Sequence, residues 1–266
     1  MQNDELLTIA RDTALAAGHL AAKRRAEGVE VAASKSSPVD VVTEADRETE
    51  LFIRQALSEA RPHDAFLGEE GERATGTSGL TWIVDPIDGT VNYLYGIPHF
   101  AVSIAVVEGD PDPQTWRALA GCVVNPTSHE VYTATAGGGA RLGTNAIRVA
   151  EGVSLAQSLV ATGFAYDAEV RGRQGALVAA LLPLVRDIRR LGSASLDLCF
   201  VAAGRYNAYF EATLSPWDHA AGALIAREAG ATVKGLGELA PGREFVLAAH
   251  PDVALQLEAL LISFGA

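Results

Sequence analysis

Two aspartates that follow an apolar run are the first sign of chemistry in the sequence. Asp85 and Asp88 lie three positions apart in the segment TWIVDPIDGT. The proline between them stiffens the chain, which allows both carboxylates to converge on one cation while the N–H groups of Gly89 and Thr90 face an anion. Because Asp-Gly is also a common turn signal, an ordinary turn after a strand is an equally good interpretation of this segment alone.

Two more acidic segments also have two interpretations. Glu69 and Glu70 stand beside glycines in GEEG, where a solvated loop is the simpler interpretation. Asp218 begins an apolar helical pattern in PWDHAAGALIAREAG, where its carboxylate is able to cap a helix. Each segment alone favours the structural role, and only their joint occurrence with the first segment points to a site.

Five segments, KSSPVDVVTEAD, GEEG, WIVDPIDGTVNY, GSAS and PWDHAAGALIAREAG, occur in this order along the chain. In this order they resemble the inositol monophosphatase family, the magnesium-dependent and lithium-sensitive sugar phosphatases. The resemblance runs from about residue 5 to about residue 250, and its DPIDGT and WD segments are specific. It implies an α/β (α+β) fold, the layered αβαβα sandwich of the inositol monophosphatase and fructose-1,6-bisphosphatase type.

The resemblance also implies a set of metal ligands. Glu69, Asp85 and the main-chain carbonyl of Ile87 would hold one Mg²⁺. Asp85, Asp88 and Asp218 would hold a second. All of these ligands are hard oxygens, which suit magnesium rather than zinc. Since the family recruits a third, loosely held ion near Glu69, we expect two or three Mg²⁺ ions as cofactors.

A charge count supports this ligand set independently. Its four acidic side chains would bring four negative charges to one cleft, and a phosphate ester adds about two more at neutral pH. Without cations such a cluster would not stay ionised, whereas two or three divalent ions would roughly neutralise it. One departure from the family bears on the third ion. Gly71 replaces a hydroxyl residue that often follows the paired acids, which would weaken that site.

The reaction that the resemblance implies is hydrolysis of a phosphate monoester by metal-activated water, without a covalent intermediate. In the family the attacking water also contacts a Thr-Asp pair, which matches Thr90 and Asp46. Together with Glu69, these are the expected catalytic residues. Thr43 and Asp46 also have the spacing of a capping box, so a helix-capping role competes with proton acceptance by Asp46. We favour the catalytic role.

The expected substrate-binding groups lie mainly at predicted helix starts. Such starts offer backbone N–H groups and the positive ends of helix dipoles to phosphate and hydroxyl groups. Glu211, at the end of NAYFE, matches the family residue that binds a sugar hydroxyl. The full set is Asp88, Gly89, Thr90, the turn Gly192, Ser193 and Ala194, Glu211, and Asp218.

Other residues near these segments keep simpler interpretations. For His219, a packing or supporting role fits better than metal ligation. Lys35 matches a residue of the family's mobile loop, although a solvated lysine explains it nearly as well. Arg189 and Arg190 suit either phosphate or a partner subunit, and the sequence does not decide between them. Asn207 stands where Asp is commoner, and the connection GDPDPQTWRAL is longer than a tight hairpin.

The elements that must position these residues are visible as hydrophobic patterns. Apolar residues recur every three or four positions from Asp4 to about Arg25, which predicts an amphipathic helix. A second helix is predicted from the capping box at Thr43 to about Arg61. The runs TWIVDP, FAVSIAVVEG, ALAGCVV and EVYTATA, separated by turn residues, predict a sheet.

Helical and strand patterns alternate beyond Gly143, which is typical of α/β layering. Since no repeat or long linker separates the two halves, we expect one compact unit. Its N-terminal half (residues 1–142) carries most metal-binding motifs, and its C-terminal half (143–266) completes the site. Predicted helices cover 173–188, 195–203 and 219–229, and predicted strands cover 207–211 and 245–249.

Composition limits the class of protein. With 266 residues, of which 48% are hydrophobic and 20% charged, the chain is typical of a folded globular protein. A net charge of −12 opposes direct binding to nucleic acid. The apolar stretches are too short for a membrane span and the acidic N-terminus does not resemble a signal peptide, so we expect a cytoplasmic protein. Cys122 and Cys199 are expected to be buried thiols.

These observations predict a phosphoric monoester hydrolase that acts on inositol monophosphate or a similar sugar or polyol phosphate. Histidinol phosphate, fructose 1,6-bisphosphate and 3′-phosphoadenosine phosphate remain alternative substrates, because relatives with the same metal site process all of them. A regulatory partner of the transcription machinery is an alternative from a different class, since some bacterial relatives have that role. The resemblance also implies a homodimer and inhibition by lithium.

Overall fold

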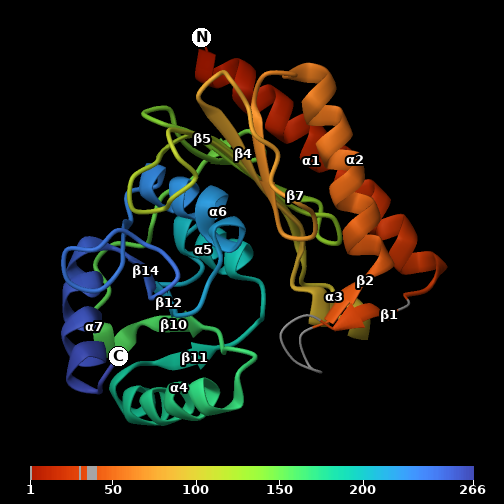
Figure 1. Cartoon of the computed structure of the whole chain (residues 1–266). Coiled ribbons are helices and arrows are strands. Elements are labelled where there is room, and N and C mark those ends of the chain that lie inside the picture. Colours follow the sequence, from red (N-terminus) through yellow and green to blue (C-terminus); the bar gives the residue numbers. More distant parts are fainter. Residues whose placement is uncertain (1, 30, 35–40) are drawn as a thin grey trace.

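Helices and sheets alternate in layers in this computed structural model, which describes residues 2–29, 31–34 and 41–266 (Figure 1). Two helices cover a seven-stranded sheet, two more lie in the middle, and a five-stranded sheet and two outer helices follow. This arrangement confirms the predicted αβαβα sandwich. The candidate site residues come from elements on both sides of the middle layer.

The first layer contains the two predicted N-terminal helices, α1 (Gln2–Glu27) and α2 (Glu44–Ala60). α1 buries residues spaced four apart, such as Leu6 and Ala10, against the large sheet. α2 begins at the predicted capping box, with Thr43 as its N-cap. Local signals therefore fix both helices, an apolar stripe in α1 and a capping box in α2.

The large sheet is ordered as in the sequence, and its strands are antiparallel except for β3 and β4. β4 is buried along its whole length, which explains why it is an unbroken apolar run rather than an alternating one. The four predicted runs correspond to β4, β5, β6 and β7. The strands are β3 (Ala65–Gly68), β4 (Leu80–Asp88), β5 (Ala101–Glu108), β6 (Arg117–Asn125), β7 (Glu130–Thr135), β8 (Gly139–Leu142) and β9 (Asn145–Ala146).

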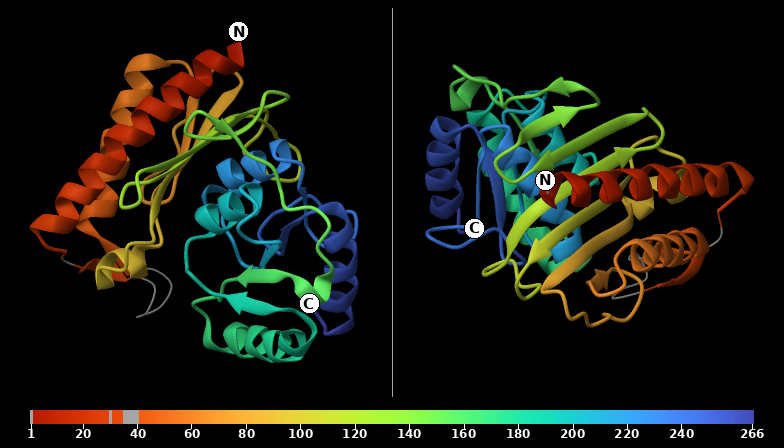
Figure 2. Two further views of the ribbon diagram at one scale, coloured as in Figure 1. Left: turned by 180° about the vertical axis from the view of Figure 1, so that it is seen from behind. Right: turned by 90° about the horizontal axis from the view of Figure 1, so that it is seen from above.

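The middle helices α5 (Ala194–Ala202) and α6 (Pro216–Glu228) lie between the two sheets. The outer helices α4 (Ala168–Leu181) and α7 (Pro251–Ser263) cover the far face of the smaller sheet (Figure 2). That sheet has the order β11-β10-β12-β14-β13, with β10 and β12 parallel. Its strands are β10 (Leu159–Thr162), β11 (Asp187–Arg189), β12 (Ala208–Glu211), β13 (Thr232–Lys234) and β14 (Val246–Ala249).

Short elements complete the described chain. A two-stranded hairpin, β1 (Val31–Ser34) and β2 (Val41–Thr43), precedes α2, and the short helix α3 (Thr90–Tyr95) follows β4. Single 3₁₀ turns lie at η1 (Leu155–Gln157) and η2 (Leu182–Leu184).

The helix predicted over residues 173–188 is wrong at both ends. α4 begins at Ala168, because the Asp167 side chain accepts hydrogen bonds from two N–H groups of its first turn. It ends at Leu181, and the turn η2 and the strand β11 follow. Pro183 has no N–H to continue the helical hydrogen bonding, so the helix does not extend to Ile188. Ile188 lies in the strand β11. The predictions of α5, α6, β12 and β14 are confirmed with small shifts of their ends.

The two cysteines are free and buried, as predicted, with Cys122 in β6 and Cys199 in α5. Burial raises the pKa of both thiols, so they behave as small apolar side chains. No helix in the described ranges is long and apolar enough to cross a membrane.

Candidate active site

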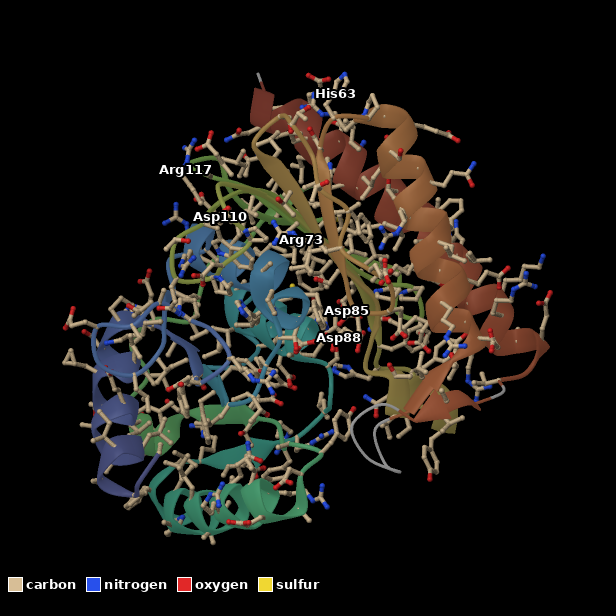
Figure 3. The ribbon with its side chains drawn as sticks, viewed as in Figure 1. His63, Arg73, Asp85, Asp88, Asp110 and Arg117 are labelled. Atoms are coloured by element: carbon tan, nitrogen blue, oxygen red, sulfur yellow. The ribbon has the colours of Figure 1, made fainter. Side chains whose placement is uncertain are left out.

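The two aspartates of DPIDGT lie where β4 departs from regular pairing with β5. Asp85 pairs with Ser103 and Asp88 with Ala101, so the residues between them form a bulge. The Ile87 N–H donates to Asp85 Oδ1 at 3.0 Å, which fixes the turn. Bulges redirect side chains and are frequent beside active sites. Figure 3 shows both aspartates at the end of β4, between the large sheet and the middle helices.

Asp88 joins the two halves of the chain. Its Oδ2 accepts hydrogen bonds from Ser193 Oγ at 2.6 Å and from the Ser195 N–H at 2.7 Å, and the Ser195 hydroxyl also donates to it. Burial raises the pKa of Asp88, although the serine donors oppose this shift. One carboxylate is thus held between the end of β4 and the start of α5.

The turns that precede α3 and α5 approach each other closely. Gly89 and Gly192 both have positive φ angles, of 96° and 86°. A Cβ on Gly89 would lie 3.1 Å from the Gly192 carbonyl oxygen. Asn92 Nδ2 donates to the Leu191 carbonyl at 2.7 Å, which ties α3 to the second turn. The two helix starts that were predicted to bind anions are therefore neighbours.

Asp46 uses its two carboxylate oxygens differently. Oδ2 accepts the Thr43 N–H at 2.7 Å and the Thr43 hydroxyl, which completes the capping box of α2. Oδ1 lies 3.1 Å from Thr90 Oγ1, which also lies 3.1 Å from the Ile87 carbonyl oxygen. The side chain is fully buried, and burial raises its pKa to about 6. Helix capping and a Thr-Asp pair are therefore compatible in this structure.

Asp218 reaches the site from the first turn of α6. The Ser215 N–H donates to its Oδ2 at 2.6 Å, so the carboxylate caps the helix, as its simpler interpretation required. Burial raises its pKa well above the ordinary value, and the negative charges of Glu69 and Asp88 raise it further. Asp218 is therefore close enough to Glu69 and Asp88, two other expected ligands, for their charges to affect its pKa.

A buried glutamate that the sequence analysis did not single out organises the GEEG segment. Glu50 of α2 accepts the Glu70 N–H at 2.7 Å and pairs with Arg54 at 3.3 Å. A Cβ on Gly71 would lie 2.6 Å from Glu50 Oε1, so the glycine makes room for this carboxylate. A sequence signal for Glu50 was present. It lies one helical turn after Asp46, on the buried face of α2.

Glu211 lies at the end of β12, beside the middle helices. Its Oε2 accepts a hydrogen bond from the Tyr209 hydroxyl at 2.7 Å, and a Cβ on Gly163 would overlap its carboxylate. Burial raises its pKa to about 7, although the positive charge of Arg190 opposes the shift. Arg190 is therefore close to the candidate site, whereas Arg189 forms an exposed ion pair.

The acidic side chains and the Ile87 carbonyl suit Mg²⁺ by their donor chemistry. Among the described residues, the groups that most affect the pKa of Asp88 and Asp218 are carboxylates and hydrogen-bond donors rather than cations, so a divalent cation would offset negative charge there. Across the described ranges, no three His, Cys, Asp or Glu side chains form a ready-made metal-binding cluster. Protein donors instead satisfy the carboxylates, namely the serines at Asp88 and Ser215 at Asp218.

His219 packs in the core next to the candidate site. Its ring lies 6.0 Å from that of Trp116, and burial lowers its pKa to about 4, so it is neutral. Neither ring nitrogen has a hydrogen-bond partner within the described part of the chain. Asn207 has a structural role, since its Oδ1 accepts the Leu159 N–H at 2.8 Å. Lys35 lies outside the described residues.

Direct hydrogen bonds connect several of the predicted site residues, namely Asp46 with Thr90, Thr90 with Ile87, and Asp88 with Ser193. Ser195, Asn92 and Glu50 are site residues that were not predicted from the sequence. Ser195 is the second serine of GSAS, so its position beside the predicted turn was a usable signal. For Asn92, no sequence pattern indicated its role.

The sequence is similar to proteins of one family. A family model described as "Inositol monophosphatase family" matches residues 2–260. An inositol-1-monophosphatase of Mycobacterium bovis is 44% identical over 252 residues, covering 91% of this chain and 85% of the relative. A Nus factor SuhB of Vibrio cholerae is 38% identical over 231 residues, covering 86% of this chain and 84% of the relative.

Solved structures are similar as well. The crystal structure of the extragenic suppressor protein suhB from Bartonella henselae superposes with a TM-score of 0.87 at 35% sequence identity. The match covers 96% of this chain and 98% of that chain.

Proposed function

The chain belongs to the inositol monophosphatase family, and on that premise we propose that it is a magnesium-dependent phosphomonoesterase. Its substrate is inositol monophosphate or a similar sugar or polyol phosphate. One observation carries the proposal. Asp88, at the end of β4, is hydrogen-bonded to Ser193 and Ser195 at the start of α5, which brings a proposed metal ligand together with a helix start proposed to bind phosphate.

Five residues of this chain would hold the ions. They are Glu69, Asp85 and the Ile87 carbonyl for one ion, and Asp85, Asp88 and Asp218 for another. A third ion would bind near Glu69. When bound, magnesium lowers the pKa of a water molecule and offsets negative charge on the phosphate and the leaving oxygen.

The Thr90 and Asp46 side chains receive the proton of the attacking water. Thr90 Oγ1 accepts a hydrogen bond from the water while its own hydroxyl hydrogen points to Asp46 Oδ1, 3.1 Å away. Asp46 is buried and has a pKa of about 6, so it is ionised at neutral pH and basic enough to accept a proton. The oxygen that leaves phosphorus takes up a proton, and no covalent intermediate forms on the protein.

The substrate is bound by the helix starts and by Glu211. Backbone N–H groups of Gly89 and Thr90 and of the turn formed by Gly192, Ser193 and Ala194 would bind phosphate oxygens and hydroxyls, and the Ala194 N–H also donates to the Asp88 carboxylate. Glu211 accepts a hydrogen bond from a hydroxyl of the polyol. Its buried carboxylate, held by Tyr209, gives that hydroxyl a fixed position.

The proposal is tested with a panel of phosphate esters in the presence of Mg²⁺. The panel contains inositol 1-phosphate, histidinol phosphate, fructose 1,6-bisphosphate and 3′-phosphoadenosine 5′-phosphate. We expect the highest kcat/KM for inositol 1-phosphate, measured as phosphate release. If none of the esters released phosphate, the proposed activity would be wrong.

A second candidate function is regulation through the transcription machinery, which the name of the Vibrio cholerae relative, Nus factor SuhB, suggests. The net charge of −12 favours contact with a protein over contact with RNA. Pull-down of purified RNA polymerase by an Asp88→Asn variant would support a role that does not need catalysis. We also propose that the protein is cytoplasmic and that it forms a homodimer. Sedimentation analysis would test the homodimer.

A further inference from the structure

A cavity of about 1070 Å³ opens at the edge of the smaller sheet where the parallel strands β10 and β12 end. In open α/β sheets, ligands bind outside the carboxyl ends of the parallel strands. Pockets for drug-sized ligands have volumes of roughly 300–1000 Å³, so this cavity is large for a polyol phosphate alone. It leaves room for a second part of a ligand.

The cavity shares Glu211 with the proposed substrate site. Gly163 and Glu211 lie in its wall, and so does Pro216, two positions before Asp218. Glu211 is the residue proposed to bind a substrate hydroxyl, and its carboxylate lies against Gly163. A substrate bound to Glu211 through a hydroxyl therefore has the cavity directly beyond that hydroxyl.

The interior of the cavity is apolar and its rim is polar. Leu177 and Val178 of α4, Phe210 of β12, and Leu236 supply much of the interior surface. A nucleobase would require hydrogen-bond partners that such a surface does not provide, whereas an aliphatic chain requires none. Apart from Glu211, the charged side chains of the wall are exposed, and they are Asp112, Arg173, Arg243 and Glu244.

α4 is only partly covered by the rest of the described chain, since Leu177 and Val178 pack against the core but remain partly exposed. Of its 14 residues, only Leu181 is buried. Ala176 is exposed and lines the cavity, beside the partly buried Leu177. An apolar ligand in the cavity would remove from water a surface that the fold leaves accessible.

The connection between β5 and β6 closes the opposite side. Pro113 and Gln114 line the cavity, and the Gln114 side chain bonds to both the carbonyl and the N–H of Ala240, at 3.1 and 3.2 Å. A tight hairpin would need no such length. The extra residues of this connection thus build a wall of the cavity and join it to the second half of the chain.

We infer that the cavity binds the aliphatic chain of an extended substrate, a polyol phosphate monoester that carries one acyl chain. This inference rests on the proposed phosphatase function, because it assigns a substrate class to the same site. The phosphate and polyol bind beside Glu211, and the chain enters between α4 and Leu236. The reaction is unchanged. Water adds to phosphorus, the bond from phosphorus to the polyol oxygen breaks, and that oxygen takes up a proton.

The test compares glycerol 3-phosphate with its 1-butanoyl, 1-hexanoyl and 1-octanoyl esters, each below its micelle concentration. Every methylene transferred out of water is worth up to about fourfold in affinity. We expect kcat/KM to rise at least about tenfold from the butanoyl to the octanoyl ester, mainly through a lower KM.

Matched tryptophan variants of α4 show whether the chain enters this cavity. Ala176→Trp fills the cavity, whereas Ala179→Trp adds the same side chain at an exposed position that does not line it. Ala176→Trp should remove the chain-length effect and keep activity on glycerol 3-phosphate within about twofold, and Ala179→Trp should behave as the parent. Ala180 also lines the cavity. Ala180→Trp therefore replaces Ala176→Trp if circular dichroism shows that Ala176→Trp is unfolded.

The outcomes separate this inference from the proposed function. Activity on glycerol 3-phosphate without a chain-length effect would overturn the inference alone. No phosphate release from any ester would contradict the proposed function. Calorimetry with 1-octanoylglycerol would then show whether the cavity binds an acyl chain. Binding to the parent and Ala179→Trp but not to Ala176→Trp supports the cavity assignment, and no binding to the parent overturns it. A changed oligomeric state of Ala176→Trp in sedimentation would identify a second copy as the occupant and overturn the inference.

Discussion

Asp88 is the residue at which the chemistry and the architecture of the candidate site meet. Its carboxylate belongs to β4, yet the groups that donate to it belong to Ser193 and Ser195 of the second half. Burial raises its pKa, so an ionised Asp88 is costly unless a cation is present. This position suits the metal-ligand role proposed for Asp88, since a bound cation would stabilise the buried carboxylate.

The Asp88→Asn variant should lose at least about a hundredfold in kcat, the scale on which an electrostatic catalytic group matters. The fold should persist, because an amide oxygen still accepts from the serines and a buried charge is removed. Phosphate release and a circular-dichroism melt measure both effects, with the exposed Asp110→Asn as the control. Unchanged turnover, or a melted spectrum, would favour a purely structural Asp88.

Asp46 is expected to support activity but to lower the stability of the fold at neutral pH. Its pKa is about 6 in the folded chain against 3.8 as the ordinary value, so the folded state binds the proton more tightly. The stability linked to this group is fully present below pH 3.8 and is lost as pH rises through about 6. At pH 7.5 the buried, ionised carboxylate therefore destabilises the fold by up to about 3 kcal/mol.

Asp46→Asn should lower kcat at least about tenfold while raising Tm at pH 7.5 by a few degrees. The Tm difference should shrink at pH 4, where the parent carboxyl is protonated. In the parent, kcat/KM should fall below about pH 6 as the proton acceptor becomes protonated. Activity assays and melts at both pH values test this, with the exposed Glu44→Gln as the control. Full activity combined with a lower Tm at pH 7.5 would make Asp46 a helix cap only.

At the scale of elements, the close approach of the two turns is specific to Gly89. Its φ angle of 96° is nearly that of Gly109, at 95°. A Cβ on Gly89 would lie 3.1 Å from two backbone oxygens, whereas a Cβ on Gly109 would meet nothing within 4 Å. Gly109→Ala therefore measures backbone strain alone, and Gly89→Ala measures strain together with the lost approach between α3 and α5.

Gly109→Ala should cost about 1 kcal/mol in stability and leave kcat unchanged. Gly89→Ala should cost about 2–3 kcal/mol and lower kcat at least about tenfold, because Asp88 and the start of α5 move apart. Denaturant unfolding and phosphate release provide both values. Equal effects of the two substitutions would mean that the approach of the turns has no role in the site.

Elements with strong local signals were predicted well from the sequence. α2 has both a capping box and an apolar stripe, and β4 is a buried apolar run that ends at two aspartates. α7 was not predicted, and its N-cap is His250, which is not one of the usual capping residues. The end of α4 was wrong because an apolar pattern was continued through Pro183.

Contacts between residues far apart in the sequence could not be predicted from this chain alone. Asp88 and Ser195 are 107 positions apart, and no periodicity connects them. The role of Glu50 depends on where the GEEG segment folds back against α2, which only the tertiary structure shows. The family resemblance supplied the proposed roles of the acidic residues, and the structure added their hydrogen-bonding partners.

At the scale of the whole molecule, the site depends on how the two halves pack. α5 and α6 belong to the second half but cover the large sheet of the first, in one continuous apolar core. We propose that residues 1–142 and 143–266 do not fold separately for this reason. Asp88 and Asp218 then stay in place only in the complete sandwich.

Lithium should inhibit the enzyme at elevated Mg²⁺ by occupying the position proposed for Asp88 and Asp218 while phosphate is bound. Li⁺ accepts oxygen ligands and is close to Mg²⁺ in size, but it supplies half the charge, so it fills a site without activating chemistry. Phosphate release should fall with LiCl and not with NaCl at equal ionic strength. Equal effects of the two salts would mean that the inhibition is only screening.

The magnesium dependence of phosphate release from inositol 1-phosphate tests the central claim most directly. Chelation with EDTA should abolish release, and added Mg²⁺ should restore it, because the carboxylates of both halves need cations to bind a phosphate ester. Asp218→Asn should raise the Mg²⁺ concentration for half-maximal rate at least about tenfold. Full turnover in EDTA, with an unchanged rate in Asp218→Asn, would contradict a metal-dependent site shared by the two halves.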